Sequence, residues 1–308
     1  MKIRCDQITK KTVWKQIKNG YSNWLFLLPV IIGLSVFTLY PVIQSFVYSL
    51  TDFNGLTVRK IGFMNYADIF DFGKYGYGRE VWKSFRATFI YTLISIPVNL
   101  VLSFTLALAL HKNIPGIKVL RLLFYLPVLI PGIVGGQIWI DILSYPTGLF
   151  NQWLGRLGLP VQTFFTSEKT QFSTLLVISQ WGVGGSMIVW LAALSNIRPS
   201  LYEAADLDGA SYLKKLFKIT LPMCTPIIFY NLINLAIMCL QVFDSYAYLG
   251  RGINDGLYFI SVRIYLTAFG DAHQYGLACA LAWILFCIIG LLTVVMFKTS
   301  KWVYYDEK

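Results

Sequence analysis

Residues 274–297 of the chain read QYGLACALAWILFCIIGLLTVVMF and contain no Asp, Glu, Lys or Arg. About 20 helical residues span the hydrocarbon core of a bilayer, so this run is long enough to cross it. Similar uncharged runs occupy residues 24–51, 87–110, 122–140, 172–197 and 219–243, without the period-2 alternation of a membrane β-barrel. Because lipid satisfies no backbone hydrogen bond, the sequence predicts an all-α polytopic membrane protein with six transmembrane helices.

The composition agrees with a chain that faces lipid. Of the 308 residues, 56% are hydrophobic and 13% are charged, whereas a soluble domain carries about 25% charged residues. The net charge of +11 is spread between the apolar runs rather than gathered in one patch. This pattern indicates a lipid membrane, and no nucleic acid, as the partner of the basic residues.

The distribution of Lys and Arg predicts the orientation. With the N-terminus inside, 16 of the 26 basic residues lie on the cytoplasmic side, as the positive-inside rule favours. We therefore expect a basic cytoplasmic N-terminus at 1–23, a membrane domain at 24–297 with a cytoplasmic loop at 198–222, and a cytoplasmic tail at 298–308. The first run is too long for a signal-peptide core and lacks an A-x-A-like end, which predicts an uncleaved first helix.

Enzyme motifs are missing from the sequence. It contains no G-x-x-x-x-G-K-[ST] phosphate loop, no H-E-x-x-H and no G-x-S-x-G. The five cysteines form no C-x-x-C pair, and the histidines His111 and His273 fall on opposite sides of the predicted membrane. We expect no catalytic residue, no bound metal and no cofactor in this chain.

The loop at 198–222 is patterned as a helix, a turn and a second helix. Ser200 and Glu203 match an S-x-x-E capping box, and Gly209 is placed to end the first helix. Leu213, Leu216 and Phe217 give the second helix an apolar stripe. Two short amphipathic helices of this kind suit insertion into a groove of a soluble partner.

This loop resembles the EAA loop of binding-protein-dependent ABC importer permeases. The resemblance rests on the motif Glu203-Ala-Ala-x-x-Asp-Gly-Ala followed by Ile-x-Leu-Pro, whose ATPase-coupling residues would be Glu203, Ala204, Ala205, Asp208, Gly209, Ala210, Leu221 and Pro222. The segments 49–55 and 62–66 are similar to the sugar-permease subgroup of maltose and glycerol-phosphate transporters. In place of that subgroup's Gly-Gly-Gly-Pro-like turn, residues 249–256 read LGRGINDG.

The resemblance implies a type I ABC importer permease fold and a set of partners. These are a second homologous permease, two ATP-binding subunits that hold ATP and Mg²⁺, and an extracellular or periplasmic solute-binding protein. The chain would form half of the path for a carbohydrate across a bacterial-type plasma membrane. The alternatives are import of a non-sugar solute such as glycerol phosphate, or an ATP-independent channel or secondary transporter.

Polar and aromatic residues inside the apolar runs are candidates for the substrate path, because sugars bind to hydrogen-bonding groups and flat aromatic faces. Asn234 and Gln241 lie seven residues apart, two turns along one helix face. The candidates are Gln137, Trp139, Gln180, Trp181, Asn231, Asn234, Gln241 and Asp244. Hydrogen bonding between helices is an equally good explanation for any one of them.

Two other features have both a functional and a structural explanation. The pattern Leu-Pro-x-x-x-Pro begins at Leu126 and again at Leu221, and it marks either helix starts or flexible points used in access switching. The aromatic-rich segment 52–86 either receives the solute-binding protein or anchors the chain at the outer membrane interface.

Overall fold

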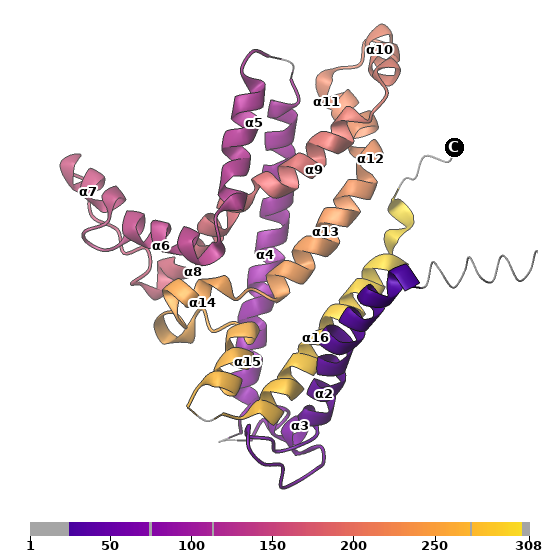
Figure 1. Ribbon diagram of the computed structural model, residues 1–308. Coiled ribbons are helices and arrows are strands. Elements are labelled where there is room, and N and C mark those ends of the chain that lie inside the picture. The colour runs from indigo at the N-terminus through magenta and orange to yellow at the C-terminus, as the bar shows by residue number, and fades with distance from the viewer. Residues whose placement is uncertain (1–24, 74–75, 113, 272, 304–308) are drawn as a thin grey trace, which may run out of the picture.

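The computed structural model describes residues 25–73, 76–112, 114–271 and 273–303. Within these ranges the regular elements are helices, and the extended pairing is a single isolated bridge between Thr51 and Ile61. Figure 1 shows the helices arranged lengthwise, with α10 (Pro199–Leu207) at one end and α3 (Met64–Ile69) at the opposite end. The all-α prediction is confirmed.

Three helices are long and apolar enough to cross a membrane without a break. They are Leu25–Ser49, which contains η1 (Ser35–Leu39) and α2 (Tyr40–Ser49), then α4 (Gly78–Leu110) and α16 (Tyr275–Lys298). Pro97 lies inside α4 without ending it. The helix α4 begins at Gly78, well before the predicted start at residue 87, because the polar first turns continue the same helix beyond the apolar run.

Three further spans are pairs of helices bent at a short break, so the structure has up to six spans. The first pair joins α5 (Ile117–Tyr125) and η2 (Leu126–Leu129) to α6 (Gly132–Leu143) at 102°. The second joins α8 (Glu168–Ser179) and η3 (Gln180–Gly182) to α9 (Gly184–Ser195) at 48°. The third joins α11 (Tyr212–Lys215), η4 (Leu216–Thr220) and α12 (Leu221–Met223) to α13 (Thr225–Leu240) at 65°.

Two of the breaks have a cause in the Leu-Pro-x-x-x-Pro pattern. Pro131 is the N-cap of α6 with ψ 136°, and Ile130 before it is extended, as a residue preceding proline favours. Pro226 lies in the first turn of α13, where a missing N–H costs no hydrogen bond, and Pro222 lies one residue before the end of the helix Tyr212–Met223. The break between η3 and α9 has no proline and follows the glycine-rich stretch at 182–185.

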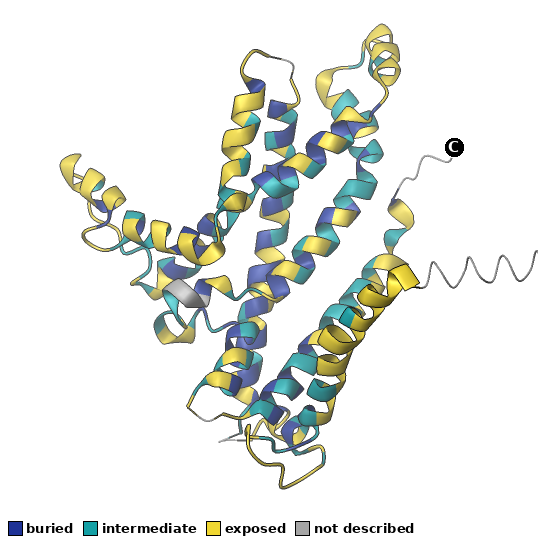
Figure 2. Cartoon of the chain, viewed as in Figure 1, coloured by how far each residue is buried: buried dark blue, intermediate teal, exposed yellow. Residues whose placement is uncertain are grey.

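The remaining helices are short and connect the spans. They are α3, α7 (Leu149–Arg156), α10, α14 (Asp244–Leu249), η5 (Ile253–Asp255), α15 (Ile260–Phe269) and η6 (Ser300–Trp302). Exposed apolar side chains cover the outer surface of the bundle, as the yellow faces of α2 and α5 show in Figure 2. In the most apolar window of Leu25–Ser49 no residue is buried, which is the expected condition of a lipid-facing helix.

The helix α4 is the centre of the bundle and packs against α9, α13 and α15. A line of small polar side chains runs along its buried face at spacings of three and four residues: Ser84, Thr88, Thr92, Ser95, Asn99 and Ser103. Several of them bond to other elements. Ser103 Oγ accepts from Trp190 Nε1 over 3.0 Å, and Thr88 Oγ1 accepts from the backbone N–H of Ile260 over 3.0 Å. Polar contacts of this kind hold membrane helices together where the hydrophobic effect does not.

Candidate functional site: a polar cavity and an exposed loop

The bent spans and α4 line a cavity of about 880 Å³ that is open on one side. Its walls come from α4, the breaks at 127–130 and 180–182, and the helices α6, α9, α13 and α14. The hydrogen-bonding side chains in the lining are Tyr91, Ser95, Asn99, Trp139, Ser179, Gln180, Trp181, Ser186, Tyr230, Asn231, Asn234, Gln241, Asp244 and Ser245. Such a volume is typical of small-ligand sites.

Seven of the eight residues predicted for the substrate path line this one cavity. They are Trp139, Gln180, Trp181, Asn231, Asn234, Gln241 and Asp244. The eighth, Gln137, is exposed on α6 and donates from Nε2 to Asp141 Oδ1 over 3.3 Å. The tertiary fold therefore brings residues of three different spans and of α14 to one place, while their contact with a solute stays a prediction.

The cavity also contains residues that the sequence analysis missed. Ser95 and Asn99 belong to the polar line of α4, and their spacing with Ser84, Thr88 and Ser103 was a signal in the sequence. Asn99 Nδ2 donates to Gln180 Oε1 over 3.1 Å, and Gln180 Nε2 donates to Ser95 Oγ over 3.3 Å. Gln180 thus joins the break in the fourth span to the central helix.

Four polar atoms on the cavity wall are buried and have no hydrogen-bond partner in the described part of the chain. They are Asn99 Oδ1, Trp139 Nε1, Asn231 Nδ2 and Ser245 Oγ. Leaving a buried polar group unpaired costs about 1–3 kcal/mol, so folded proteins avoid it unless another molecule pairs with the group. Two donors, one acceptor and one hydroxyl are therefore unpaired in residues that line the cavity, which makes these residues candidates for rearrangement toward a hydroxyl-rich solute.

Aromatic rings form one side of the cavity. The rings of Trp139 on α6 and Trp181 in η3 meet edge to face with centroids 5.7 Å apart. Gly135 lies so close to Trp181 that an added Cβ would be 3.2 Å from the indole ring. The glycine therefore lets α6 approach the break in the fourth span and places an indole pair beside the unpaired polar atoms.

Asp244 is the one Asp, Glu, Lys, Arg or His among the residues that line the cavity. Its carboxylate lies against Gly132 at the start of α6, where an added Cβ would collide with Asp244 Oδ2 and come within 2.9 Å of Cγ. Among the described residues no side chain caps the start of α6 with a hydrogen bond, so Asp244 and Gly132 meet by close packing at the junction of α6 and α14.

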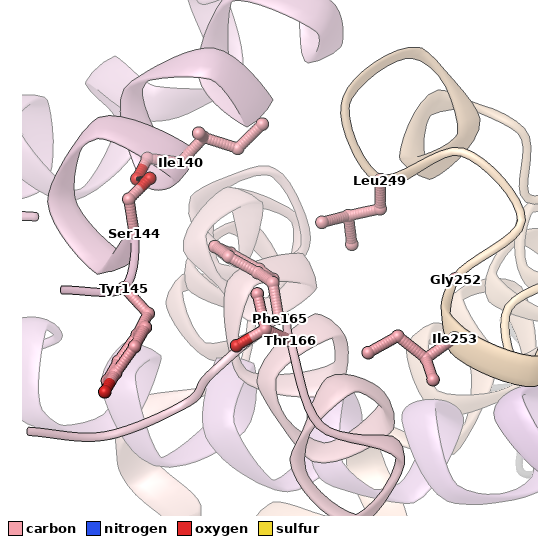
Figure 3. Close-up of a pocket in the computed structure, with 8 residues that line it drawn as sticks. All are labelled: Ile140, Ser144, Tyr145, Phe165, Thr166, Leu249, Gly252 and Ile253. Atoms are coloured by element: carbon pink, nitrogen blue, oxygen red, sulfur yellow. Dashed lines mark hydrogen bonds between the residues drawn. The ribbon is translucent and has the colours of Figure 1, made fainter.

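A smaller cleft of about 450 Å³ lies at the other end of these two helices. Figure 3 shows Ile140, Ser144 and Tyr145 on one side of it and Leu249, Gly252 and Ile253 on the other, with Phe165 and Thr166 between them. Gln171 on α8 fixes the 249–256 segment, because its side chain accepts from Ile253 N over 2.7 Å and donates to Ile253 O over 2.9 Å. The cleft therefore has one wall held firmly in place.

The loop at 198–222 forms two helices, as predicted, with α10 before Gly209 and α11 after it. Gly209 has a φ of +66° and closes α10 in a Schellman motif, in which Gly209 N donates to Asp206 O over 3.0 Å and Ala210 N donates to Ala205 O over 2.9 Å. The two arms are joined by an ion pair between Lys215 Nζ and Asp206 Oδ1 at 2.5 Å. The turn is therefore a defined structure.

The predicted capping box is wrong. The helix α10 begins at Pro199 with Arg198 as N-cap, and Ser200 lies inside its first turn. Proline at the first helical position fixes φ for the helix, and the N-cap lies two residues earlier than predicted, at Arg198 instead of Ser200. Glu203 is exposed and is left without a capping role.

The loop that carries Glu203 also carries exposed apolar side chains. Leu207 is 91% exposed, and Leu213 and Phe217 are each 61% exposed. Of the remaining predicted coupling residues, Ala204 and Asp208 are exposed, Ala205 and Ala210 are half-buried, and Leu221 and Pro222 are half-buried at the start of the fifth span. A rigid turn that presents apolar and acidic groups together is suited to docking.

A bundle of apolar helices around a cavity lined by both polar and apolar side chains, with no metal-binding cluster among the described residues, is the architecture of a membrane permease. The chain matches none of the protein-family models compared with it. It is 36% identical over 298 residues to YesP of Bacillus subtilis (strain 168), described as a probable ABC transporter permease, with 94% of each chain covered. It is 30% identical over 290 residues to MsmF of Streptococcus mutans, a multiple sugar-binding transport system permease, covering 93% of this chain and 98% of that one.

A solved structure shares the fold. A bacterial alginate ABC transporter, in complex with a periplasmic protein bound to an alginate pentasaccharide, contains a chain that matches with a TM-score of 0.82 and 24% identity, covering 94% of this chain and 96% of that chain. The chain therefore belongs to the sugar ABC transporter permeases. It is a multi-pass membrane protein and a transport component, and ATP hydrolysis belongs to a separate subunit.

Proposed function

We propose that this chain forms half of the translocation path of an ATP-driven, solute-binding-protein-dependent importer of a carbohydrate. The observation that carries the proposal is the lining of one cavity, which combines the amide side chains of Asn99, Asn231, Asn234 and Gln241 with aromatic rings. Sugar hydroxyls both donate and accept hydrogen bonds, so these amides suit a glycan. The Trp139 and Trp181 indoles beside them suit the apolar faces of pyranose rings.

The coupling to ATP is proposed to run through the loop at 198–222. In this mechanism Glu203, with the exposed Leu207 and Leu213, inserts into a groove of an ATP-binding subunit. The Schellman turn at Gly209 and the ion pair between Lys215 and Asp206 make the loop stiff enough to transmit a movement of that subunit. Its direct connection to the fifth span carries the movement to the cavity wall.

The assembly proposed here contains a second homologous permease, two ATP-binding subunits and an extracellular or periplasmic solute-binding protein. The cavity has an open side in the single chain, which a second permease would close. Both termini are proposed to be cytoplasmic, since that orientation places 16 of the 26 basic residues inside.

Purification of the tagged chain from native membranes in mild detergent tests the proposal. We expect mass spectrometry to find a second six-helix permease and an ATPase, and the complex to hydrolyse ATP. The Glu203→Ala/Gly209→Ala double variant is expected to lose the ATPase while it keeps the second permease. Recovery of a homo-oligomer without a nucleotide-binding partner would favour a channel or secondary transporter instead.

A further inference from the structure

The hydroxyl groups of Tyr202 and Thr220 join the base of the exposed loop to the start of the fifth span. The two residues are 18 positions apart in the chain, and their hydroxyl oxygens are hydrogen-bonded over 2.8 Å. Tyr202 lies on α10 directly before Glu203, and Thr220 is the last residue of η4, directly before α12. The bond therefore connects the helix that carries the proposed ATPase contact to the helix that continues into the membrane.

This hydrogen bond is largely shielded from water. Thr220 is 4% exposed, and Tyr202 is half-buried. Tyr202 and Ile219 pack against a buried apolar cluster that includes Leu110 of α4 and Leu194 of α9. Water competes little for a hydrogen bond in such surroundings, and a hydroxyl left there without a partner is costly. The bond is therefore a stable feature of the base of the loop.

A second link between the two arms of the loop is more exposed. It is the ion pair between Lys215 Nζ and Asp206 Oδ1, in which the Asp206 side chain is 61% exposed. An ion pair in contact with water contributes little to stability, and salt screens it. The bond between Tyr202 and Thr220 is therefore the restraint on α10 that water and salt do not weaken.

The bond is made at a π-helical turn. In η4, Leu221 N donates to Leu216 O, five residues back instead of the four of an α-helix. Thr220 Oγ1 also lies 3.4 Å from its acceptor Lys215 O within the same turn. Turns of this kind are rare and are found frequently at functional sites. Because a π-turn contains an extra residue, the direction in which α12 leaves the loop depends on this turn, which Tyr202 contacts from outside.

We propose, on the basis of the importer function above, that Tyr202 is a positioning residue for ATP coupling, because its bond to Thr220 makes α10 and the start of the fifth span move as one body. A displacement of the ATPase docked at Glu203 is then passed to the span. Without the bond, α10 still docks through its exposed face, but it can turn about its two ends, the extended Arg198 and the turn at Gly209. ATP hydrolysis then continues while the span follows it less.

Hydrogen exchange of the assembled complex measures this transmission without a solute. The complex is compared with and without MgATP and vanadate, which trap the ATPase subunits closed, and the readout is the difference in exchange for the peptides of α10 and of α12–α13. In the parent we expect both peptides to respond. Tyr202→Phe removes only the hydroxyl and keeps the ring in the apolar cluster. It should leave the α10 response unchanged and reduce the α12–α13 response about fivefold, the factor that corresponds to the net free energy of one hydrogen bond.

This difference is not moved by a purely structural role, which would change exchange equally with and without vanadate. ATP hydrolysis by the Tyr202→Phe complex is measured on the same sample and should persist. A full α12–α13 response in this variant would overturn the proposal. Loss of the response in α10 as well would show that the bond serves docking and would overturn it too.

Matched variants separate the bond from the residues that make it. Tyr212→Phe is the control, because Tyr212 is 65% exposed on α11 and its hydroxyl has no hydrogen bond in the described part of the chain. Thr220→Val should reproduce the effect of Tyr202→Phe, and Thr220→Ser, which keeps the hydroxyl, should respond as the parent does. The Tyr202→Phe/Thr220→Val double variant should be no worse than either single variant, since both remove the same bond. Additive losses would mean that the two hydroxyls act separately and would contradict the positioning role.

The positioning role and the importer function fail in different ways. If the parent complex contains its ATPase and responds to vanadate, and Tyr202→Phe responds equally in α12–α13, the positioning role is wrong and the importer function stands. If no ATPase is recovered with the parent chain, the importer function itself is wrong. If Thr220→Val does not assemble, Tyr202→Phe decides. A Tyr202→Phe chain that does not assemble would make the bond a structural one and would overturn the positioning role.

Discussion

Asn99 on α4 donates a hydrogen bond of 3.1 Å to Gln180, which lies 81 residues away at the break between α8 and α9. This bond fixes the break against the central helix, while Asn99 Oδ1 is buried and has no hydrogen-bond partner in the described part of the chain. Asn99 also lines the cavity, so the same residue supports the fold and is a candidate for contact with a solute.

Replacement of Asn99 should weaken solute use more than it weakens the fold. We expect Asn99→Ala to raise the apparent KM for uptake about tenfold. The substitution removes the proposed solute contact and the hydrogen bond to Gln180, and the two losses together cost about 1–3 kcal/mol. Uptake kinetics in proteoliposomes with the cognate solute measure this. The control is Ser103→Ala, which removes the partner of Trp190 outside the cavity and should change thermal stability without changing KM.

Asn231 offers a sharper separation of stability from function. Its Nδ2 is buried without a partner, so Asn231→Leu should raise the melting temperature of the purified complex while it abolishes uptake. Asn151 is the matched control, because its side chain bonds to Ser144 O and to both the N–H and the C=O of Gln162. Asn151→Leu should lower the melting temperature. A destabilised Asn231→Leu variant would contradict the assignment of this amide to a solute.

Glu203→Ala should leave membrane insertion and thermal stability intact and reduce solute-stimulated ATP hydrolysis. The reason is that Glu203 is exposed and caps no helix. Ser200→Ala is the control, since Ser200 lies inside the first turn and makes no cap hydrogen bond. Normal uptake by the Glu203 variant would contradict a role for this residue in coupling.

Gly209 tests whether the shape of the loop matters. At a φ of +66°, Gly209→Ala should destabilise the turn by about 1–2 kcal/mol, the cost of a left-handed conformation for an L-residue. Gly209→Asn should recover much of the loss, because asparagine tolerates this conformation. Hydrogen exchange of the Ala210 amide, which closes the Schellman motif, and ATPase activity should change in parallel across the two variants.

The loop after α2 should depend on pH through Asp52. Its Oδ1 accepts from the backbone N–H groups of Lys60 and Arg59 over 2.9 and 2.8 Å, and these bonds lower the pKa of the carboxyl below 3.8. Because the pKa of Asp52 is lower in the folded state than in the unfolded chain, its ionised carboxylate stabilises the loop above pH 3.8. This stabilisation is lost as the pH falls through the folded-state pKa of Asp52. Exchange protection of the Arg59 and Lys60 amides should therefore be constant from neutral pH to about pH 5 and disappear in stronger acid. Asp52→Ala should remove the protection at every pH.

The loop at 198–222 illustrates how far local sequence patterns reach. The two helices and the stop at Gly209 follow from residues that are neighbours in the chain, and the structure has both. The N-cap of α10 was predicted at Ser200 on the S-x-x-E pattern, and it lies at Arg198. Pro199 was the stronger signal, because proline at a first helical position restricts the backbone more strongly. Local competition between two signals was the source of that error.

The cavity shows where such patterns end. Trp139, Gln180 and Asn231 were candidates because they are polar or aromatic residues within apolar runs. The sequence pattern could not indicate which of the candidates line the same cavity. Gln137 has the same chemistry as Gln180 and lies outside the lining, because only the register of the bent helix decides which face turns inward. Ser95 and Asn99 were missed since small polar residues in a membrane helix carry little signal unless their spacing is examined.

The sequence by itself determined that the chain is a helical membrane protein with up to six spans, because uncharged runs of this length have no other stable state in lipid. It also determined the form of the exposed loop, whose turn depends on one glycine. The tertiary structure alone decided the bend of 102° before α6, the contact between Asp244 and Gly132, and the meeting of four unpaired polar atoms in one cavity. All three features depend on how distant helices pack against one another. When every face of a helix is apolar enough to insert into lipid, hydropathy does not indicate which face turns inward.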